Sequence, residues 1–226
     1  MNTKIILDFL TDLSKNNAKE WMDQNKAAYK EAYNEFADLV QEFIVQLSEA
    51  DPSIRYLNSR DLIFRLNRDT RFSHDKSPYN PSFRAHISSG GRVPVPVGYF
   101  INVTPEDIFL GGGLFASQFT DATGMVRNYI VKHGSELEQI LQDGDFSKYY
   151  TLMGEKLKNI PRGYESDAPY GEFLKHKSWF IENHISPDEF LDTQHFIAIA
   201  KERFLLMKPF NDFLNRALTN FKMPVR

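Results

Sequence analysis

The segment RDTRFSHDKSPY, residues 68–79, gathers in twelve positions several groups that bind anions. Arg68 and Arg71 carry planar guanidinium groups whose paired N–H donors match the oxygens of a phosphate or carboxylate. Arg65 precedes them at the end of an expected strand, and Lys76 adds an ammonium group. These cations predict a binding site for a small anionic ligand that carries phosphate.

Three further side chains of the segment leave its chemistry open. Asp69 and Asp75 are candidates to orient the cations, to act as a general base, or to hold Mg²⁺. Tyr79 is expected to donate to an oxyanion or to stack on a ring. Both an enzyme and a binding protein are compatible with this set, and the sequence requires no metal and no cofactor. A third interpretation is an Arg–Asp network that only holds the loop in place.

Three consecutive glycines form a second candidate feature. They lie in the sequence FLGGGLFASQF, between an expected strand and an expected helix. Glycines at such a junction let backbone N–H groups approach an anion at the N-terminus of a helix. Consecutive glycines after a strand are also typical of a bulge or a tight turn. We expect Gly112 and Gly113 to join the ligand site if adjacent strand ends bring them to residues 68–79.

The charge of the chain is unevenly distributed. Residues 55–92 contain eight basic and three acidic side chains, a net charge of +5 in a chain whose total is -3, so the rest carries -8. This separation favours an anion site on an acidic body and makes a small ligand the better fit than a nucleic acid. The alternative is a nucleic-acid or protein-interaction module that uses the same basic patch.

Composition excludes several classes of site. The chain has no cysteine, which excludes disulfides and thiolate catalysis and fits a reducing cytoplasm. Its six histidines show no metal-ligand spacing, so any metal should be a hard ion with oxygen ligands. No signal peptide and no apolar run long enough for a membrane span is apparent. We therefore predict a soluble cytoplasmic protein and assign it no oligomeric state.

The hydrophobic periodicity of the sequence predicts the elements that position these groups. We expect them to form a single α+β domain with a mostly antiparallel sheet flanked by helices. Apolar residues recur at helical spacing near both ends of the chain and alternate with polar ones between them. The expected blocks are a helical region at 1–50, a sheet meander at 60–110, a helical region at 118–157, a strand at 178–185, and C-terminal helices at 187–221.

Four details of this layout can be checked individually. Asn17, with Glu20 three residues later, predicts the capped start of a helix that runs to about residue 49. The alternation in 60–67 predicts a strand whose buried face includes Phe64. Gly134 is expected to end one helix. Pro209 is expected to kink the last one.

The stretches FLTDLSKNNAKEWM, RDTRFSHDKSPYN and GYFINVTPEDIFLGGGLF, in this order, resemble the family called domain of unknown function 2461, which occurs widely in bacteria and in some fungi. The resemblance spans nearly the whole chain and implies that residues 68–79 and the glycines belong to one shared feature. It implies no activity. The chain departs from the pattern at Met22, Asn80 and Leu114-Phe115, and the last two departures bear on the ligand. The positions that match are Asn17, Trp21, Arg68, Asp69, Arg71, Phe72, Asp75, Lys76, Pro78, Tyr79, Gly112 and Gly113.

Overall fold

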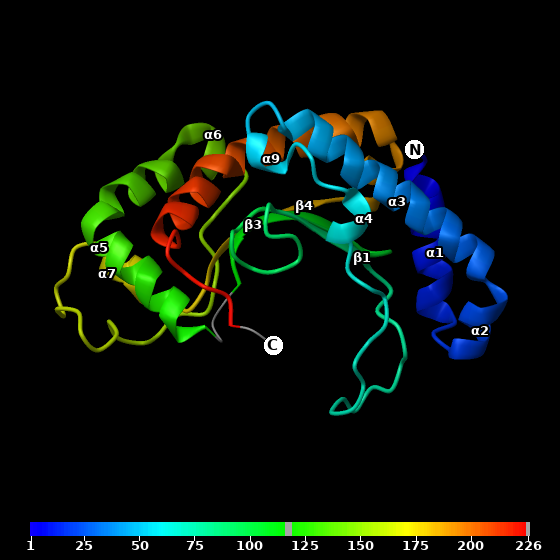
Figure 1. The fold of residues 1–226 in the computed structure, drawn as a ribbon, viewed down its shortest axis with the longest axis horizontal. Helices are drawn as coiled ribbons and strands as arrows, with labels where there is room; N and C mark the ends of the chain where they lie inside the picture. The colour runs from blue at the N-terminus through cyan, green and yellow to red at the C-terminus, as the bar shows by residue number, and fades with distance from the viewer. Residues whose placement is uncertain (116–118, 225–226) are drawn as a thin grey trace. The chain divides into compact units, whose positions relative to one another are not determined.

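The computed structural model describes residues 1–115 and 119–224 (Figure 1). Its helices and its four-stranded antiparallel sheet form an α+β fold, as the sequence predicted. Within these ranges no helix has both the length and the apolar character that a membrane crossing requires. The described helices are α1 Thr3–Lys15, α2 Lys19–Gln24, α3 Lys26–Leu47, α4 Ser59–Leu62, α5 Thr120–Gln142, α6 Gly144–Ser147, α7 Gly171–Leu174, α8 Pro187–Leu191 and α9 Thr193–Ala217, with a 3-10 turn η1 at Pro52–Ile54.

The sheet has the strand order β1-β2-β3-β4, so strands that follow one another in the sequence are also neighbours in space. This order confirms the expected meander from residue 83 onward and the expected last strand. Side chains alternate between two faces, and those of the inner face are buried. The strands are β1 Phe83–Ile87, β2 Tyr99–Val103, β3 Ile108–Leu114 and β4 Trp179–Ile185.

The described chain divides into two compact units built from interleaved segments. The first unit comprises residues 1–92, 100–110 and 184–202, and the second comprises 93–99, 111–183 and 203–226. The single domain that the sequence predicted stays a prediction. Each unit has an aromatic core of its own, and all contacts described below lie within one unit or the other.

The core of the first unit forms where α1 and α3 cover the inner face of β1. In Figure 1 these two helices lie side by side, with α2 near one end of the pair. The ring of Phe83 on β1 stacks on Phe36 of α3 at 5.3 Å and on Phe9 of α1 at 6.0 Å. Stacked aromatic side chains bury large apolar surfaces, so this cluster fixes β1 and the segment that leads into it.

The second helix was expected to run from 17 to about 49, but the chain forms two helices with a break at Asn25, where φ is −109° and ψ is 22°. Asn17 is not the cap. The N-cap of α2 is Ala18, which makes no side-chain capping bond. Sequence alone suggested the capping box because the spacing is right, but the Asn17 side chain instead bonds the backbone of a distant segment.

The strand expected at 60–67 is also wrong over its first half. Ser59–Leu62 forms the short helix α4, because the side chain of Asn58 accepts a hydrogen bond from Arg60 N and starts a helical turn. The chain becomes extended only afterwards, with isolated antiparallel bridges Ile63↔Ala85 and Asn67↔Tyr79. Phe64, expected on the buried face, is only half-buried.

The helical region expected at 118–157 is shorter at its C-terminal end. Its start at residue 118 falls outside the described residues, α5 and α6 end at Ser147, and no helix covers 148–157 in the structure described. Gly134 directly follows a kink in α5. At His133 φ is −129° and ψ is 19°, which is not helical, so α5 consists of two helical parts that meet where the sequence predicted one helix to end.

The C-terminal helices follow the prediction closely. Ser186 and Glu189 form a capping box at the start of α8, with Pro187 at the first helical position. The helix α9 then runs through Pro209 and ends at Ala217, four residues before the expected end at 221, and the kink expected at Pro209 stays a prediction.

Candidate functional site

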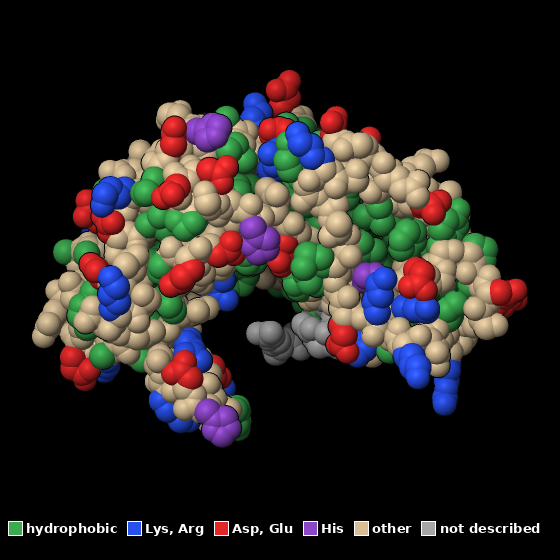
Figure 2. Space-filling view, turned by 180° about the vertical axis from the view of Figure 1, so that it is seen from behind, with side chains coloured by type: hydrophobic (Ala, Val, Ile, Leu, Met, Phe, Trp, Pro, Cys, Tyr) green, Lys and Arg blue, Asp and Glu red, His purple; other side chains and the backbone are tan. Residues whose placement is uncertain are grey.

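Residues 68–79, which we call the arm, form the end of a hairpin in the first unit. At its base Arg68 N donates to Pro78 O at 2.9 Å, and Asn80 N donates to Leu66 O at 2.7 Å. These bonds extend the antiparallel pairing between 63–67 and β1. Figure 2 shows the arm as the narrow lobe at the lower left, with charged side chains of both signs on its surface. The arm is therefore held at its base and exposed along its length.

Asn17 fastens this base to the N-terminal helices. Its side-chain Nδ2 donates to Tyr79 O at 2.9 Å, and its Oδ1 accepts from Tyr79 N at 3.1 Å. One amide side chain thus completes the backbone bonding of a residue 62 positions away, in the manner of a neighbouring strand. Asn17 therefore anchors the arm, whereas its spacing from Glu20 had suggested a helix cap.

The two arginines of the arm are paired with its two aspartates. Arg68 forms an ion pair with Asp75. Arg71 makes a bidentate pair with Asp69, in which Nε donates to Oδ1 at 2.9 Å and Nη2 donates to Oδ2 at 2.6 Å. The cations expected to face a ligand are therefore already neutralised within the loop. This is the Arg–Asp network of the third interpretation, but it is exposed and not buried.

These pairs keep both carboxylates charged. Hydrogen bonds from Arg68, and then from Ser77, hold the pKa of Asp75 far below its ordinary value. The side chain of Arg71 likewise lowers the pKa of Asp69. A carboxylate with a lowered pKa is a weak base, so this geometry gives no support to the general-base role considered for either residue.

The remaining members of the expected site differ in availability. Lys76 is exposed and its Nζ donates to Thr70 O at 3.0 Å. Arg65 is exposed and forms no hydrogen bond or ion pair with any described residue. Tyr79, expected to stack on a ligand, is only 9% exposed and packs into the base of the arm. A stacking role for Tyr79 therefore does not fit.

The aromatic ring that the arm does expose is Phe72. It is 95% exposed, and the guanidinium of Arg71 lies 5.9 Å from its ring centroid. Phe72 was not among the ligand contacts expected from the sequence. Its position midway between Asp69 and Asp75, with polar residues on both sides, was the available signal, because such a segment offers no apolar neighbours to cover the ring.

Gly112 and Gly113 do not form the loop that was expected. Both lie within β3 in the second unit, whereas the arm belongs to the first. A Cβ on Gly112 would lie 2.8 Å from Asn211 Oδ1, and one on Gly113 would lie 2.3 Å from Trp179 O. The glycines therefore permit close packing inside the second unit, and their expected part in a phosphate cradle is not supported by this geometry.

No group of three or more histidine, aspartate or glutamate side chains gathers to hold a metal ion within the described parts of the chain. Asp69 and Asp75, the candidates for Mg²⁺, are each engaged by an arginine. A cation site in the arm would first have to break those pairs.

Comparison with known proteins identifies one family. The model of the family described as "Conserved hypothetical protein (DUF2461)" matches residues 5–213, which is most of the chain. Searches of the curated proteins and of the solved structures found no match. The matched range contains the arm, the residue that fastens it, and the glycines of β3.

Proposed function

Since this chain belongs to the DUF2461 family, whose description assigns no activity, we propose a function from the geometry of the arm. We propose that the arm binds a phosphate-bearing anion. Its exposure favours an extended ligand, and single-stranded nucleic acid is the class that fits best. The proposal keeps the anionic ligand expected from the sequence but exchanges a small molecule for a polymer.

The observation that carries this proposal is the pair Arg71 and Phe72. A bare aromatic ring offers a stacking surface to a base of any sequence, and the adjacent guanidinium can reach the phosphate that links two bases. Arg65 and Lys76 add two exposed positive charges to the same hairpin. Stacking surfaces combined with backbone-tracking cations are the usual means of binding single strands.

The ion pairs of the arm do not prevent such binding. Pairs between exposed side chains contribute only about 0–1 kcal/mol each, so a phosphate oxygen can replace the carboxylate of Asp69 at little cost. The aspartates do reduce the net charge of the arm, and the chain outside residues 55–92 is net acidic. Binding should therefore be modest in affinity and strongly weakened by salt.

A small metabolite is the less suitable partner. Sites for small ligands bring a few polar groups together onto the ligand. The arm presents its charges on a narrow exposed hairpin, and Tyr79, the one aromatic ring that a small ligand was expected to reach, is buried.

A cytoplasmic location, expected from the absence of cysteine, belongs to the same proposal.

The test is a titration of fluorescein-labelled oligothymidylate with the protein, followed by fluorescence anisotropy. Phe72→Ala should weaken binding by about 1–3 kcal/mol, the usual contribution of one base stack. Arg71→Gln should weaken binding and reduce the slope of log K against log salt by about 0.7, as expected for one lost phosphate contact on a single strand.

The chain offers a matched control in Arg55 and Tyr56, an adjacent arginine and aromatic residue on the surface of the same unit. Tyr56 is 92% exposed, so Arg55→Gln and Tyr56→Ala remove the same groups away from the arm. Both should bind as the parent does. Equal losses of oligothymidylate affinity in the two pairs of variants would refute the proposal. If inorganic phosphate competes with oligothymidylate at low millimolar concentration, a small anionic ligand becomes the better interpretation.

A further inference from the structure

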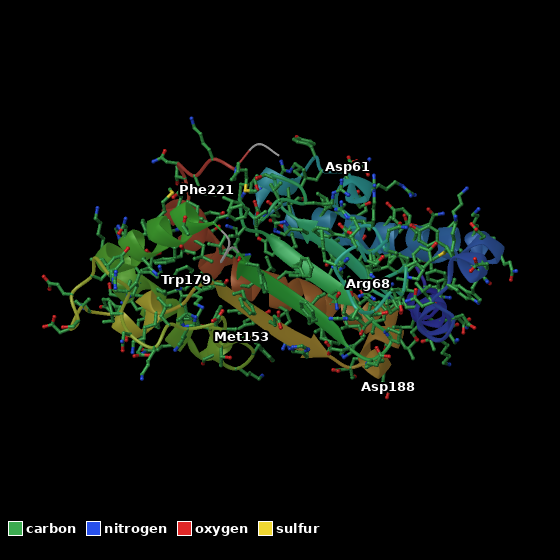
Figure 3. The ribbon with its side chains drawn as sticks, turned by 90° about the horizontal axis from the view of Figure 1, so that it is seen from below. Asp61, Arg68, Met153, Trp179, Asp188 and Phe221 are labelled. Atoms are coloured by element: carbon green, nitrogen blue, oxygen red, sulfur yellow. The ribbon has the colours of Figure 1, made fainter. Side chains whose placement is uncertain are left out.

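The outer face of the sheet in the first unit carries a row of rings. Phe64, Phe100, Phe109 and His184 follow one another with centroid separations of 6.1, 5.8 and 5.7 Å. The row thus extends from the segment beside β1, across β2 and β3, to β4. Figure 3 looks onto this side of the strands. The phenylalanines are half-buried, so each ring keeps part of its surface open to solvent.

Arg84 of β1 lies at one end of this row without a counter-charge. Its guanidinium is 5.7 Å from the ring centroid of Phe64. The side chain is half-buried, and its Nε is fully buried with no hydrogen-bond partner among the described residues. Burial alone lowers the pKa of Arg84, and no acidic group offsets the effect. Because Nε is enclosed, the donors that a ligand can reach are the terminal Nη groups, and the charge of the side chain remains uncompensated.

Buried donors without partners are rare, because each loses its bonds to water and gains nothing in return. A second one lies close by in the sequence. The Ser82 side chain is buried, with its residue 4% exposed, and its Oγ has no partner in the part of the chain that the structure describes. At the other end of the row the carboxylate of Asp107 already has a hydrogen-bonding partner, since His184 Nδ1 lies 2.9 Å from both of its oxygens.

We infer that this face binds a small aromatic carboxylate, whose carboxylate pairs with Arg84 and whose ring packs against Phe100 and Phe109. One arginine without a counter-charge calls for one negative charge, and its fork of N–H groups fits the two oxygens of a carboxylate. A phosphate ester carries a second negative charge, for which the row offers no further arginine or lysine. The aromatic row supplies the apolar contact area that a single ion pair cannot.

This site is separate from the arm, and the two proposals succeed or fail independently. The residues that carry it are Arg84 and the sheet phenylalanines, none of which belongs to 68–79. Phe72→Ala and Arg71→Gln should therefore leave binding of the carboxylate unchanged.

The test uses the full chain and the probes benzoate, phenylacetate and 3-phenylpropionate, each observed by NMR through the Nε–H resonance of Arg84. At least one probe should shift this resonance saturably at millimolar concentration. Acetate, which lacks the ring, and benzyl alcohol, which lacks the charge, should each bind at least about tenfold more weakly. Absence of saturable binding by all three probes, or equal binding of acetate, would overturn the inference.

Arg84→Met should lower the affinity at least about tenfold, as expected when a charge-assisted pair is lost. Because the replacement also removes an uncompensated, half-buried charge, the melting temperature of the free protein should stay constant or rise. A fall of several degrees would show that Arg84 is structural and would overturn the inference.

Arg60 provides the matched control. Its guanidinium also lies over a ring, 5.6 Å from the centroid of Tyr33, but its Nη2 already donates to Asn34. Arg60→Met should leave the affinity for the aromatic carboxylates unaltered. Equal loss in the two variants would assign the effect to general charge and refute a site at Arg84.

Discussion

Asn17 shows at the scale of one residue how a side chain can substitute for a strand. Its amide makes two hydrogen bonds to the backbone of Tyr79 in a partly buried place. Asn17→Ala should lower the free energy of unfolding by about 1–3 kcal/mol, because it leaves a backbone donor and acceptor without partners. Chemical denaturation measures the loss, and the amide of Tyr79 should exchange its hydrogen faster.

Asn16 is the control for this change. It is exposed and its side chain makes one local bond, to Asp12 O at 2.9 Å. Asn16→Ala should therefore change the unfolding free energy by about 0.5 kcal/mol or less. Similar losses at both positions would contradict the anchoring role of Asn17.

The ion pair between Arg68 and Asp75 makes a prediction about pH. The pKa of Asp75 is lowered from 3.8, chiefly by Arg68, so the pair contributes to stability above pH 3.8 and loses its contribution as pH falls through the lowered pKa. A carboxyl NMR titration should give Asp75 a midpoint below 3.8. Arg68→Gln should raise that midpoint, whereas Arg71→Gln should raise the midpoint of Asp69 instead.

If Asp75 titrates at its ordinary value in the parent protein, the pair does not persist in solution. An Arg–Asp network among these four residues was one of the interpretations that the sequence left open. The sequence did not predict which arginine takes which aspartate. That choice depends on the turn of the backbone, which no local pattern in the arm specifies.

At the scale of elements, β3 depends on a residue that has no side chain. Gly113 has φ of +101°, and an added Cβ would lie 2.3 Å from Trp179 O and 2.7 Å from Phe180 Cα. Gly113→Ala should therefore cost about 3 kcal/mol or more, from backbone strain together with the clash against backbone atoms. Gly124→Ala, in open space on α5, should instead be neutral or stabilising by up to about 1 kcal/mol.

Thermal melts of the two variants compare them directly. A stable Gly113→Ala protein would mean that β3 and β4 can separate without loss. The sequence shows the run of three glycines but not that they lie inside β3. A glycine needed for close packing and a glycine needed for a loop have the same local sequence signature.

The arm should be dispensable for folding. Its base closes at the bond from Arg68 N to Pro78 O, so residues 69–77 can be replaced by Asn-Gly, a two-residue hairpin turn. The shortened protein should melt within about 2 °C of the parent, because the arm is exposed and its ion pairs are internal. It should no longer bind oligothymidylate.

A drop of many degrees in the melting temperature of the shortened protein would show that the arm stabilises the fold.

The segment that precedes the arm illustrates why the prediction of secondary structure fails locally. Residues 60–67 alternate as a strand should, yet Asn58 starts a helical turn and Phe64 turns its ring toward Arg84. Capping and a long-range contact outweigh the local period there.

At the scale of the whole molecule, the periods in the sequence were sufficient for the fold class. Each predicted strand from 83 to 110 and the strand at 178–185 is present, since alternation is strong where one face is buried. The division into two units was not predictable. It is defined by which segments lie against each other, and residues 93–99, too short to suggest a separate body, belong to the second unit.

The interleaving of the two units has a consequence for heredity. Each unit is encoded by three separate stretches of the gene, with stretches of the other unit between them. Neither can be acquired, lost or duplicated by joining one block of coding sequence to another. The arm differs, because its two ends meet at one hydrogen-bonded pair and its coding sequence is continuous. A change of length there leaves both units complete, so the gene can alter what the arm binds without dividing either unit.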